Sequence, residues 1–300
     1  MSNGQYAPPP SLDGQLKLVE CVSEIRATRP QAIAEALERR RRRPLLNENG
    51  VMFLVAADHT ARGVLKSGAD RMAMANRGEL LRRLIVALGR PGVDGLLATP
   101  DIVEDLALLG ALDDKVVFGT MNRGGLGGAC FELDDRFTAY TAEAIVAAGL
   151  DGGKMMVRIH DDDPGTLPTL VACAEAISAL AAHKLPAMVE VFASNDDPDA
   201  LMRAVAIASG LGVTSAYTWL KLPAVADMQR VLTATTLPTV LLGGDPGPEA
   251  ALVDRWASAM SAPQVRGLVV GRTLLYPPDG DVAAAVDAAA GVLARRRVAA

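Results

Sequence analysis

The sequence predicts an α/β protein that folds as a (β/α)8 TIM barrel with an N-terminal helical extension. Beyond Val51, short apolar runs alternate with amphipathic stretches rich in Ala and Leu. This alternation is typical of parallel strands joined by helical crossovers, which cover the sheet with helices. Eight runs are the number that closes the barrel, and they span residues 51–58, 93–99, 115–120, 153–159, 186–192, 215–221, 238–244 and 265–271.

The same pattern divides the chain into a helical extension, residues 1–50, and a barrel, residues 51–300, close to the ~250 residues typical of the fold. We expect the extension to plug the bottom of the barrel or to mediate assembly. Its basic run "ERRRRRP", residues 38–44, is interpreted as a solvated helix C-terminus whose cations complement the helix dipole.

An open doubly wound sheet is the competing fold, and it would need a GxGxxG fingerprint after an early strand. The segment "RGGLGGAC", residues 123–130, has the glycines but lacks the full fingerprint and the acidic residue at the expected distance. We therefore favour the barrel and interpret this segment as a mobile loop after the third strand.

Composition and charge argue against several classes of function. The net charge of −5 argues against a nucleic-acid partner. No stretch approaches the ~18 uninterrupted apolar residues of a membrane span, and the polar, Pro-rich N-terminus lacks the layout of a signal peptide. The three widely spaced cysteines indicate reduced thiols rather than a disulfide or zinc framework. We therefore expect a cytoplasmic protein that binds neither nucleic acid nor membrane.

Polar residues near the C-terminal ends of the strands are the candidates for the active site, because barrels place their active sites there. Side chains alternate along a strand, and the apolar set of each strand suits the helix layer. The charged set should therefore point into the barrel. It comprises Asp58 at the end of the first run, Lys154 and Arg158 in the fourth, Glu190 in the fifth, and Lys221 in the sixth, beside Tyr217 and Trp219.

Lys221 lies in the predominantly apolar run "TSAYTWLKLPAV", although the chain has only six lysines. Burial and a second cation such as Lys154 both lower the pKa of a lysine, and the neutral amine attacks carbonyls to give a Schiff base. Asp58 and Glu190 can then transfer protons. Simpler roles also fit: Lys221 could reach solvent, Lys154 and Glu190 could form a structural ion pair, and Asp58 could cap a turn.

Glycines end the last two runs, where barrels commonly bind phosphate through backbone N–H groups. Gly243 and Gly244 end the seventh run, and Gly271 ends the eighth. Arg272 follows and can add charge-assisted hydrogen bonds, and Arg158 is a further candidate for binding the substrate. These residues predict a phosphorylated small-molecule substrate.

The chain from about Val51 to Arg296 resembles the class I aldolases of the deoxyribose-phosphate and tagatose-bisphosphate aldolase superfamily. The resemblance rests on the order of short motifs along six strands: "AADHTARGVLKSG", "GGKMMVRIHDDD", "MVEVF", "WLKLP", "LLGGDPG" and "GLVVGRTLLYP". It implies that Lys221 is the Schiff-base lysine and that the last two motifs bind phosphate. "RGGLGGAC" departs from the family pattern, and "GGDPG" lacks the usual small polar residue after its glycines.

The chain also resembles aldolase-like proteins of actinobacterial inositol-catabolism clusters. That resemblance implies the substrate 2-deoxy-5-keto-gluconate 6-phosphate, which would be split to dihydroxyacetone phosphate and malonate semialdehyde. The sequence thus predicts a lyase that acts on a phosphorylated keto sugar or sugar acid and needs no metal and no cofactor beyond the covalent lysine imine. Related barrels often assemble, so we expect a homo-oligomer.

Two other functions stay open. A metal-dependent aldolase or lyase could use His59 and His160, with Asp58 and Asp161, as ligands of a divalent ion, although no HxH or ExxH spacing is present. A barrel that only binds a sugar phosphate, for example as a regulator, would need no amine chemistry at Lys221.

Overall fold

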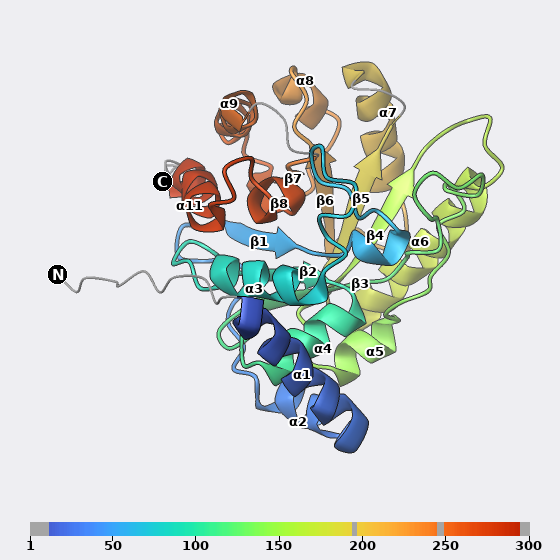
Figure 1. The fold of residues 1–300 in the computed structure, drawn as a ribbon. Coiled ribbons are helices and arrows are strands. Elements are labelled where there is room, and N and C mark those ends of the chain that lie inside the picture. Colours follow the sequence, from blue (N-terminus) through green and yellow to red (C-terminus); the bar gives the residue numbers. More distant parts are fainter. Residues whose placement is uncertain (1–11, 194–196, 245–248, 295–300) are drawn as a thin grey trace.

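The computed structural model describes residues 12–193, 197–244 and 249–294. Eight parallel strands follow one another around a closed barrel in chain order (Figure 1), which confirms the predicted fold. The strands are β1 (Met52–Ala56), β2 (Gly95–Ala98), β3 (Val116–Thr120), β4 (Gly152–Arg158), β5 (Ala187–Phe192), β6 (Thr218–Pro223), β7 (Thr239–Leu242) and β8 (Val265–Val270).

Helices surround the barrel, and several begin at residues that favour helix N-termini. The Asn76 side chain accepts a hydrogen bond from the backbone N–H of Glu79 at 3.0 Å, and Thr141 accepts one from Ala144 at 3.2 Å. In the described ranges, no helix combines the length and the apolar character needed to cross a membrane. The elements after β1 are η1 (Thr60–Arg62), α3 (Arg77–Leu88), α4 (Pro100–Leu108), α5 (Ala142–Ala147), α6 (Thr166–Ala182), α7 (Pro198–Ser209), α8 (Met228–Leu232), α9 (Glu249–Ala259), α10 (Arg272–Leu275) and α11 (Val282–Ala294).

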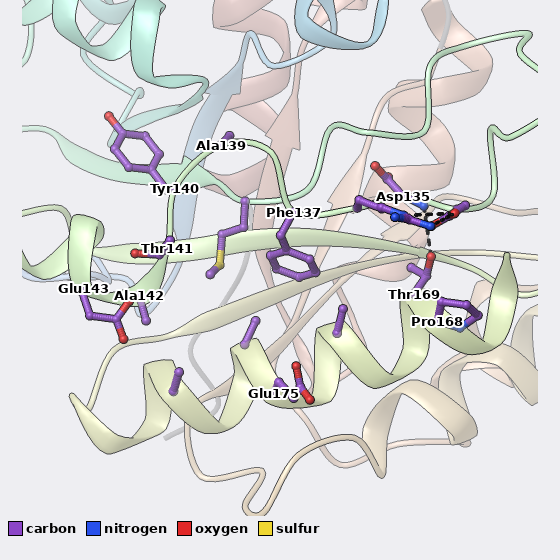
Figure 2. A pocket seen from close by; sticks show the side chains of 16 residues that line it. Asp135, Phe137, Ala139, Tyr140, Thr141, Ala142, Glu143, Pro168, Thr169 and Glu175 are labelled. Atoms are coloured by element: carbon purple, nitrogen blue, oxygen red, sulfur yellow. Dashed lines mark hydrogen bonds and ion pairs between the residues drawn. The ribbon is translucent and has the colours of Figure 1, made fainter.

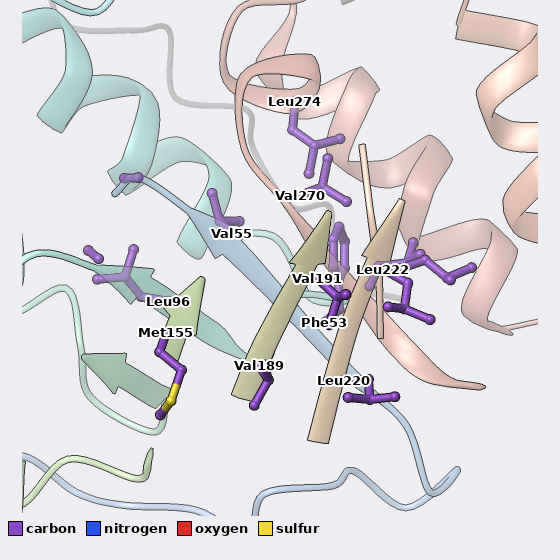
Figure 3. Close-up of a cluster of buried hydrophobic side chains, with 14 of the residues drawn as sticks. Phe53, Val55, Leu96, Met155, Val189, Val191, Leu220, Leu222, Val270 and Leu274 are labelled. Atoms are coloured by element: carbon purple, nitrogen blue, oxygen red, sulfur yellow. The ribbon is translucent and has the colours of Figure 1, made fainter. Parts of the chain in front are cut away.

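Two apolar clusters lie on the two faces of the strands. The larger fills the layer between strands and helices, with side chains such as Val189, Val191 and Leu220 (Figure 3). The smaller fills the barrel interior from the alternate strand positions, which include Met188 on β5 and Trp219 on β6. Because side chains alternate along a strand, the residues two positions beyond Met188 and Trp219 also face the interior.

The N-terminal extension packs on one side of the barrel and closes one end of it. Helix α1 (Leu12–Thr28) packs on α3, and α2 (Ala32–Arg39) packs on α4 (Figure 1). In the segment between α2 and β1, Leu45 and Leu46 pack against the interior cluster. Since this segment enters β1 at its N-terminal end, it covers the end of the barrel opposite the predicted active site.

The basic run at the end of α2 is only in part the solvated helix terminus that we expected. The Arg40 side chain is only 2% exposed and lies 3.2 Å from Asp151, and Arg43 pairs with Asp94 at 2.9 Å. The interpretation is therefore wrong for these two arginines, whereas Arg39, Arg41 and Arg42 are exposed as expected. The physical reason is that both aspartates are buried next to strand starts, where a carboxylate needs a cationic partner.

Strand β6 also begins later than the sequence pattern suggested. The backbone N–H of Thr218 donates to the carbonyl of Ser215 at 3.0 Å, and this turn delays the start of the strand. Tyr217 therefore lies before the strand, while Trp219 and Lys221 share its inner face.

Candidate active site

Lys221 and Glu190 meet inside the barrel on neighbouring strands. Backbone pairing of β5 with β6 places the two residues side by side, and both are buried. The Lys221 Nζ donates a hydrogen bond to Glu190 Oε1 at 2.5 Å. Lys154, from β4, contacts the other carboxylate oxygen, Oε2. One carboxylate therefore bridges two lysines.

Asp58 extends this cluster from the end of β1. Its Oδ2 accepts hydrogen bonds from Lys154 Nζ at 3.0 Å and from Thr120 Oγ1 at 3.2 Å. The guanidinium of Arg123, which lies just beyond β3, forms an ion pair with the same oxygen. Charged contacts thus run without interruption from Lys221 through both carboxylates to Arg123.

Burial and neighbouring charges set the protonation of the cluster. Burial lowers the pKa of the Lys221 amine, Glu190 opposes this shift, and Arg123 and Arg272 lower the pKa further. The pKa of Lys154 lies well below its usual value, because burial and the charge of Arg123 disfavour the ammonium form. Burial alone would raise the pKa of Glu190, but the two lysines outweigh it and hold that pKa well below its usual value. A lowered pKa favours the neutral amine that attacks a carbonyl.

A cavity of about 220 Å³ opens over this cluster at the C-terminal ends of the strands. Lys221, Glu190 and Asp58 line it. Lys154 is not among the lining residues and is completely buried. Of the two lysines in the cluster, Lys221 is therefore the one that a ligand in the cavity reaches.

The predicted phosphate-binding residues line the β7–β8 side of this cavity: they are Gly243, Gly244, Gly271 and Arg272. Gly244 has a φ of 74°, in the left-handed region that favours glycine. A Cβ at Gly271 would lie 2.5 Å from His59 Cε1, so the chain leaves β8 too close to β1 for a side chain. The rest of the "GGDPG" motif, residues 245–247, lies outside the described residues.

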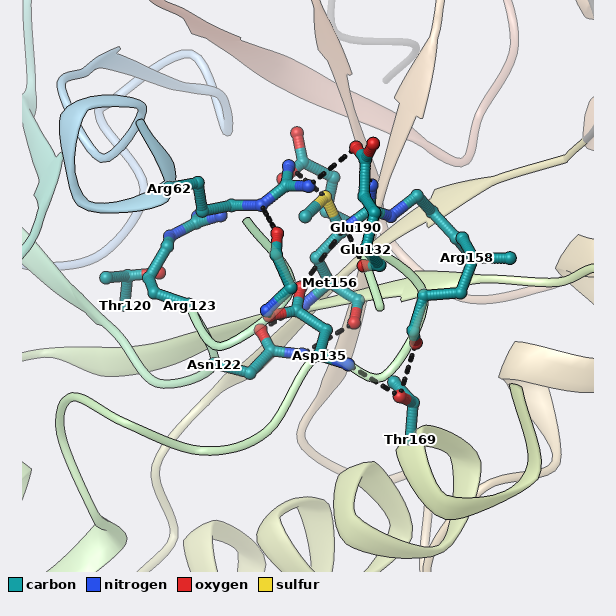
Figure 4. A network of polar contacts seen from close by, with 12 residues as sticks. Arg62, Thr120, Asn122, Arg123, Glu132, Asp135, Met156, Arg158, Thr169 and Glu190 are labelled. Carbon is teal, nitrogen blue, oxygen red and sulfur yellow. Dashed lines mark hydrogen bonds and ion pairs between the residues drawn. The ribbon is translucent and has the colours of Figure 1, made fainter. Parts of the chain in front are cut away.

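Arg158 lies away from the cavity that the other predicted site residues share. Its Nη2 donates to the Glu132 carbonyl at 2.9 Å and lies 3.6 Å from Asp135 Oδ2, and its Nη1 contacts the Glu132 carboxylate. Figure 4 shows this network beside β4. Both carboxylates come from the loop after β3. Arg158 is bound to them and is not among the residues that line the cavity. Its role in substrate binding stays a prediction.

Two arginines that the sequence analysis did not select, Arg62 and Arg123, line the cavity. Arg62 donates to the carbonyl of Gly125 at 2.7 Å and pairs with Glu132 at 2.9 Å. Arg123 is 5% exposed, so the loop of residues 123–130 also contributes a buried side chain to the cavity, and its mobility stays a prediction. One available signal was position, because Arg123 follows the third strand at the end where barrels carry function.

The two histidines of the metal-dependent alternative do not lie together. His59 lines the active-site cavity, and its Nδ1 lies 4.0 Å from Asp58 Oδ1. Burial and the charge of Arg272 lower the pKa of His59 to about 3. His160 lines a separate hollow of about 280 Å³ with Asp161. Among the described residues, no group of three or more His, Cys, Asp or Glu side chains could hold a metal ion.

A larger hollow, of about 570 Å³, lies outside the barrel between residues 134–143 and α6 (Figure 2). Phe137 and Tyr140 line one wall, and Pro168 begins the other. None of the clustered lysines or carboxylates around Lys221 lines it. The smaller cavity is therefore the candidate active site.

The chain shares its barrel fold with aldolases of known structure. A Schiff-base-forming fructose-1,6-bisphosphate aldolase matches with a TM-score of 0.62 and 17% identity, over 87% of this chain and 99% of that one. An archaeal fructose 1,6-bisphosphate aldolase matches with a TM-score of 0.63 and 18% identity, over 87% and 98% of the two chains. At these identities the likeness establishes the shared fold.

The chain belongs to the Cgl0159-like family, whose model matches residues 50–290. It is similar to Cgl0159 from Corynebacterium glutamicum, known from a crystal structure. The two chains are 53% identical, with a TM-score of 0.89, over 92% of this chain and 97% of that one. Among curated proteins, none matches.

Proposed function

We propose that this protein is a class I aldolase, a lyase that cleaves a phosphorylated keto sugar or sugar acid through an imine on Lys221. One observation carries the proposal. A buried lysine with a lowered pKa lines a cavity at the active end of the barrel, and a carboxylate lies 2.5 Å from its amine. The fold shared with Schiff-base aldolases supports the same reaction.

Imine formation needs a neutral amine and a group that delivers protons to the departing oxygen. The Lys221 nitrogen adds to the ketone carbon, and the carbonyl electron pair moves to the oxygen. Glu190, in contact with the amine, relays the proton lost by nitrogen to that oxygen and then delivers a second proton taken from solvent, so that the oxygen leaves as water. The product is a protonated imine in which the substrate is bonded to Lys221.

Cleavage follows because the protonated imine is an electron sink. The hydroxyl group on the carbon β to the imine gives its proton to Asp58, and the carbon–carbon electron pair moves into the imine as an enamine. The aldehyde half departs. Protonation of the enamine carbon and hydrolysis of the imine then release the ketone half and regenerate the amine. Lys154 makes no bond to the substrate and holds Asp58 and Glu190 in place.

The phosphate of the substrate would lie against the β7–β8 side of the cavity. There it would meet the backbone of Gly243, Gly244 and Gly271 and the Arg272 side chain. We propose 2-deoxy-5-keto-gluconate 6-phosphate as the specific substrate and inositol catabolism as the context, on the resemblance to aldolase-like proteins of inositol-catabolism clusters.

Borohydride trapping tests the imine. Reduction in the presence of dihydroxyacetone phosphate should add one adduct to the intact mass, and peptide mapping should locate it at Lys221. The Lys221→Met variant should show no adduct and at least a roughly thousandfold loss of cleavage. Lys17→Met removes an exposed lysine of α1 and should label like the unchanged protein.

An adduct on a different lysine, or turnover that survives Lys221→Met, would contradict the proposal. Loss of turnover with EDTA, without any trapped adduct, would favour the metal-dependent alternative. Binding of the sugar phosphate without turnover, unaffected by Lys221→Met, would favour the binding-only barrel.

A further inference from the structure

Arg123 is a buried cation that has no role in the reaction steps proposed above. Its side chain is 4% exposed and lines the cavity. Within the described residues, its Nε makes no hydrogen bond, whereas its Nη2 lies against the Asp58 carboxylate in an ion pair. Buried N–H groups without acceptors are costly, so a ligand that supplies acceptors would complete this part of the site.

Arg123 shares its anionic partner with a lysine. Lys154 lies against both Asp58 and Glu190, and Lys221 lies against Glu190. Among the described residues, the ion pair of Arg123 is with Asp58, which Lys154 also contacts. The protonated imine at Lys221 adds a positive charge to this cluster during cleavage. A ligand that brings a negative charge to this side of the cavity would therefore stabilise the reacting complex.

The neighbouring arginines contact other carboxylates. Arg62 pairs with Glu132 at 2.9 Å, and Arg158 contacts Glu132 and Asp135 (Figure 4). Two cations thus face two carboxylates in the adjacent network. Both arginines therefore have carboxylate partners in the adjacent network, whereas Arg123 shares its partner, Asp58, with Lys154.

Arg123 also lies across the cavity from the predicted phosphate site. In a closed barrel of eight strands, β3 and β7 are four strands apart and so face each other. Arg123 follows β3, Gly243 follows β7, and both line the cavity, while Lys221 lies on β6 next to β7. A substrate with its phosphate near Gly243 and its ketone at Lys221 would extend its aldehyde half toward Arg123.

We propose that Arg123 binds a carboxylate at the end of the substrate opposite the phosphate, so that the aldehyde product is a short aldehydo acid. This inference rests on the proposed function and names the group that determines its specificity. The planar guanidinium matches a carboxylate with two parallel hydrogen bonds. A carboxylate also brings only one negative charge, whereas a phosphate dianion would bring two next to the carboxylate of Asp58.

Aldol addition measures this specificity directly. Dihydroxyacetone phosphate serves as the donor, and 3-oxopropanoate, propanal and glyceraldehyde 3-phosphate serve as acceptors. The unchanged protein should prefer 3-oxopropanoate to propanal by at least about tenfold in kcat/KM. Arg123→Gln should reduce this preference at least about tenfold, chiefly through a higher KM for the acid. Arg136→Gln, which removes an exposed arginine of the same loop, should keep the preference.

Two kinetic outcomes would overturn the inference. An equal fall in kcat for the acidic and the neutral acceptor would show that Arg123 acts only through Asp58. A preference for glyceraldehyde 3-phosphate over the acid would show that the subsite takes phosphate. Should Arg123→Gln fail to fold, Arg123→Lys provides the test, because it keeps the charge and removes the planar fork; it should lose part of the preference.

Binding of 3-hydroxypropanoate, an unreactive analogue of the acid, separates this inference from the aldolase proposal. Calorimetry should detect binding to the unchanged protein and to Lys221→Met, and its loss in Arg123→Gln. If no imine is ever trapped but binding depends on Arg123, the aldolase proposal fails and the carboxylate subsite stands. If the imine is trapped but binding ignores Arg123, the subsite is wrong and the aldolase proposal stands.

Discussion

The barrel interior has an apolar half and a charged half. The same strands build both, but burial contributes differently to stability in the two halves. Toward the N-terminal ends of the strands, Met188 and Trp219 belong to an apolar cluster. Two residues further along the same strands, Glu190 and Lys221 are buried as a charged pair. Apolar burial stabilises the fold by about 25 cal/mol for each Å² removed from water. Buried charges stabilise it little or not at all, even when they are paired.

The two ends of the barrel differ in a similar way: one is closed by apolar packing, and the other opens into a charged cavity. The N-terminal end is closed by Leu45 and Leu46 and tied down by the buried Arg40. The C-terminal end opens into the cavity that Lys221 lines. The closed end thus contributes mainly to stability and the open end carries the proposed chemistry, and substitutions at the two ends should separate these effects.

Trp219→Ala should cause a larger loss of stability than any substitution at the charged end. It removes a bulky indole that is 8% exposed and leaves a cavity in the interior cluster. Such substitutions cost about 3–5 kcal/mol in the free energy of unfolding. Chemical denaturation followed by circular dichroism would measure the loss.

Lys221→Met, two residues further on the same face, is the matched control. Methionine fills a similar volume, and Glu190 keeps its contact with Lys154, so the free energy of unfolding should change by less than about 1 kcal/mol. A loss as large as that of Trp219→Ala would show that the charged half is as important for stability as the apolar half.

Arg40→Met tests the closed end and should have an intermediate effect. The Arg40 guanidinium donates to the backbone carbonyls of Lys115 at 2.5 Å and Gly149 at 2.7 Å, besides its contact with Asp151. Its loss leaves those acceptors buried, and Asp151 keeps Arg42 as a partner, so we expect a cost of about 2–3 kcal/mol.

Arg39→Met is the control for this substitution, because the Arg39 side chain is 70% exposed and pairs with Glu35 one helical turn away. Removal of such a surface pair should change the free energy of unfolding by less than about 0.5 kcal/mol. Equal effects at positions 39 and 40 would contradict the role given to Arg40.

The sequence predicted the barrel and the inner face of its strands because both follow from a periodicity of two. On β5 and β6, alternation alone placed Glu190, Trp219 and Lys221 on inward faces, and the structure brings Glu190 and Lys221 into contact. Such a pattern is local, so a single strand reveals which of its side chains face inward.

Contacts made by loops could not be predicted in this way. The placement of Arg123 against Asp58 and of Arg158 against Glu132 depends on how the segment after β3 folds back over the barrel mouth. The burial of Arg40 depends on Asp151, which is more than a hundred residues away in the chain. No local periodicity records these pairings, because each is set by the packing of distant segments.

The smallest effect that we predict is a pH shift at the open end. Burial lowers the pKa of Lys221, and Arg272 is one of the cations that lower it further. A nearby positive charge disfavours the ammonium form, so its removal in Arg272→Gln should raise the pKa of Lys221. The amine then stays protonated to a higher pH, so the pH at which it begins to react with a ketone rises as well.

Reductive alkylation of Lys221 with dihydroxyacetone and cyanoborohydride measures this shift without a phosphate group on the ligand. The midpoint of the rate against pH should rise by less than about 1 pH unit, because Arg272 is partly exposed and screened by solvent and salt. Arg266→Gln, on the same strand β8 but near its closed end, should leave the midpoint unchanged. A shift to lower pH, or equal shifts in both variants, would mean that the charges at the open end do not control the amine. The protonation of Lys221 would then depend on burial alone, and the contrast between the two ends would lie in packing rather than in electrostatics.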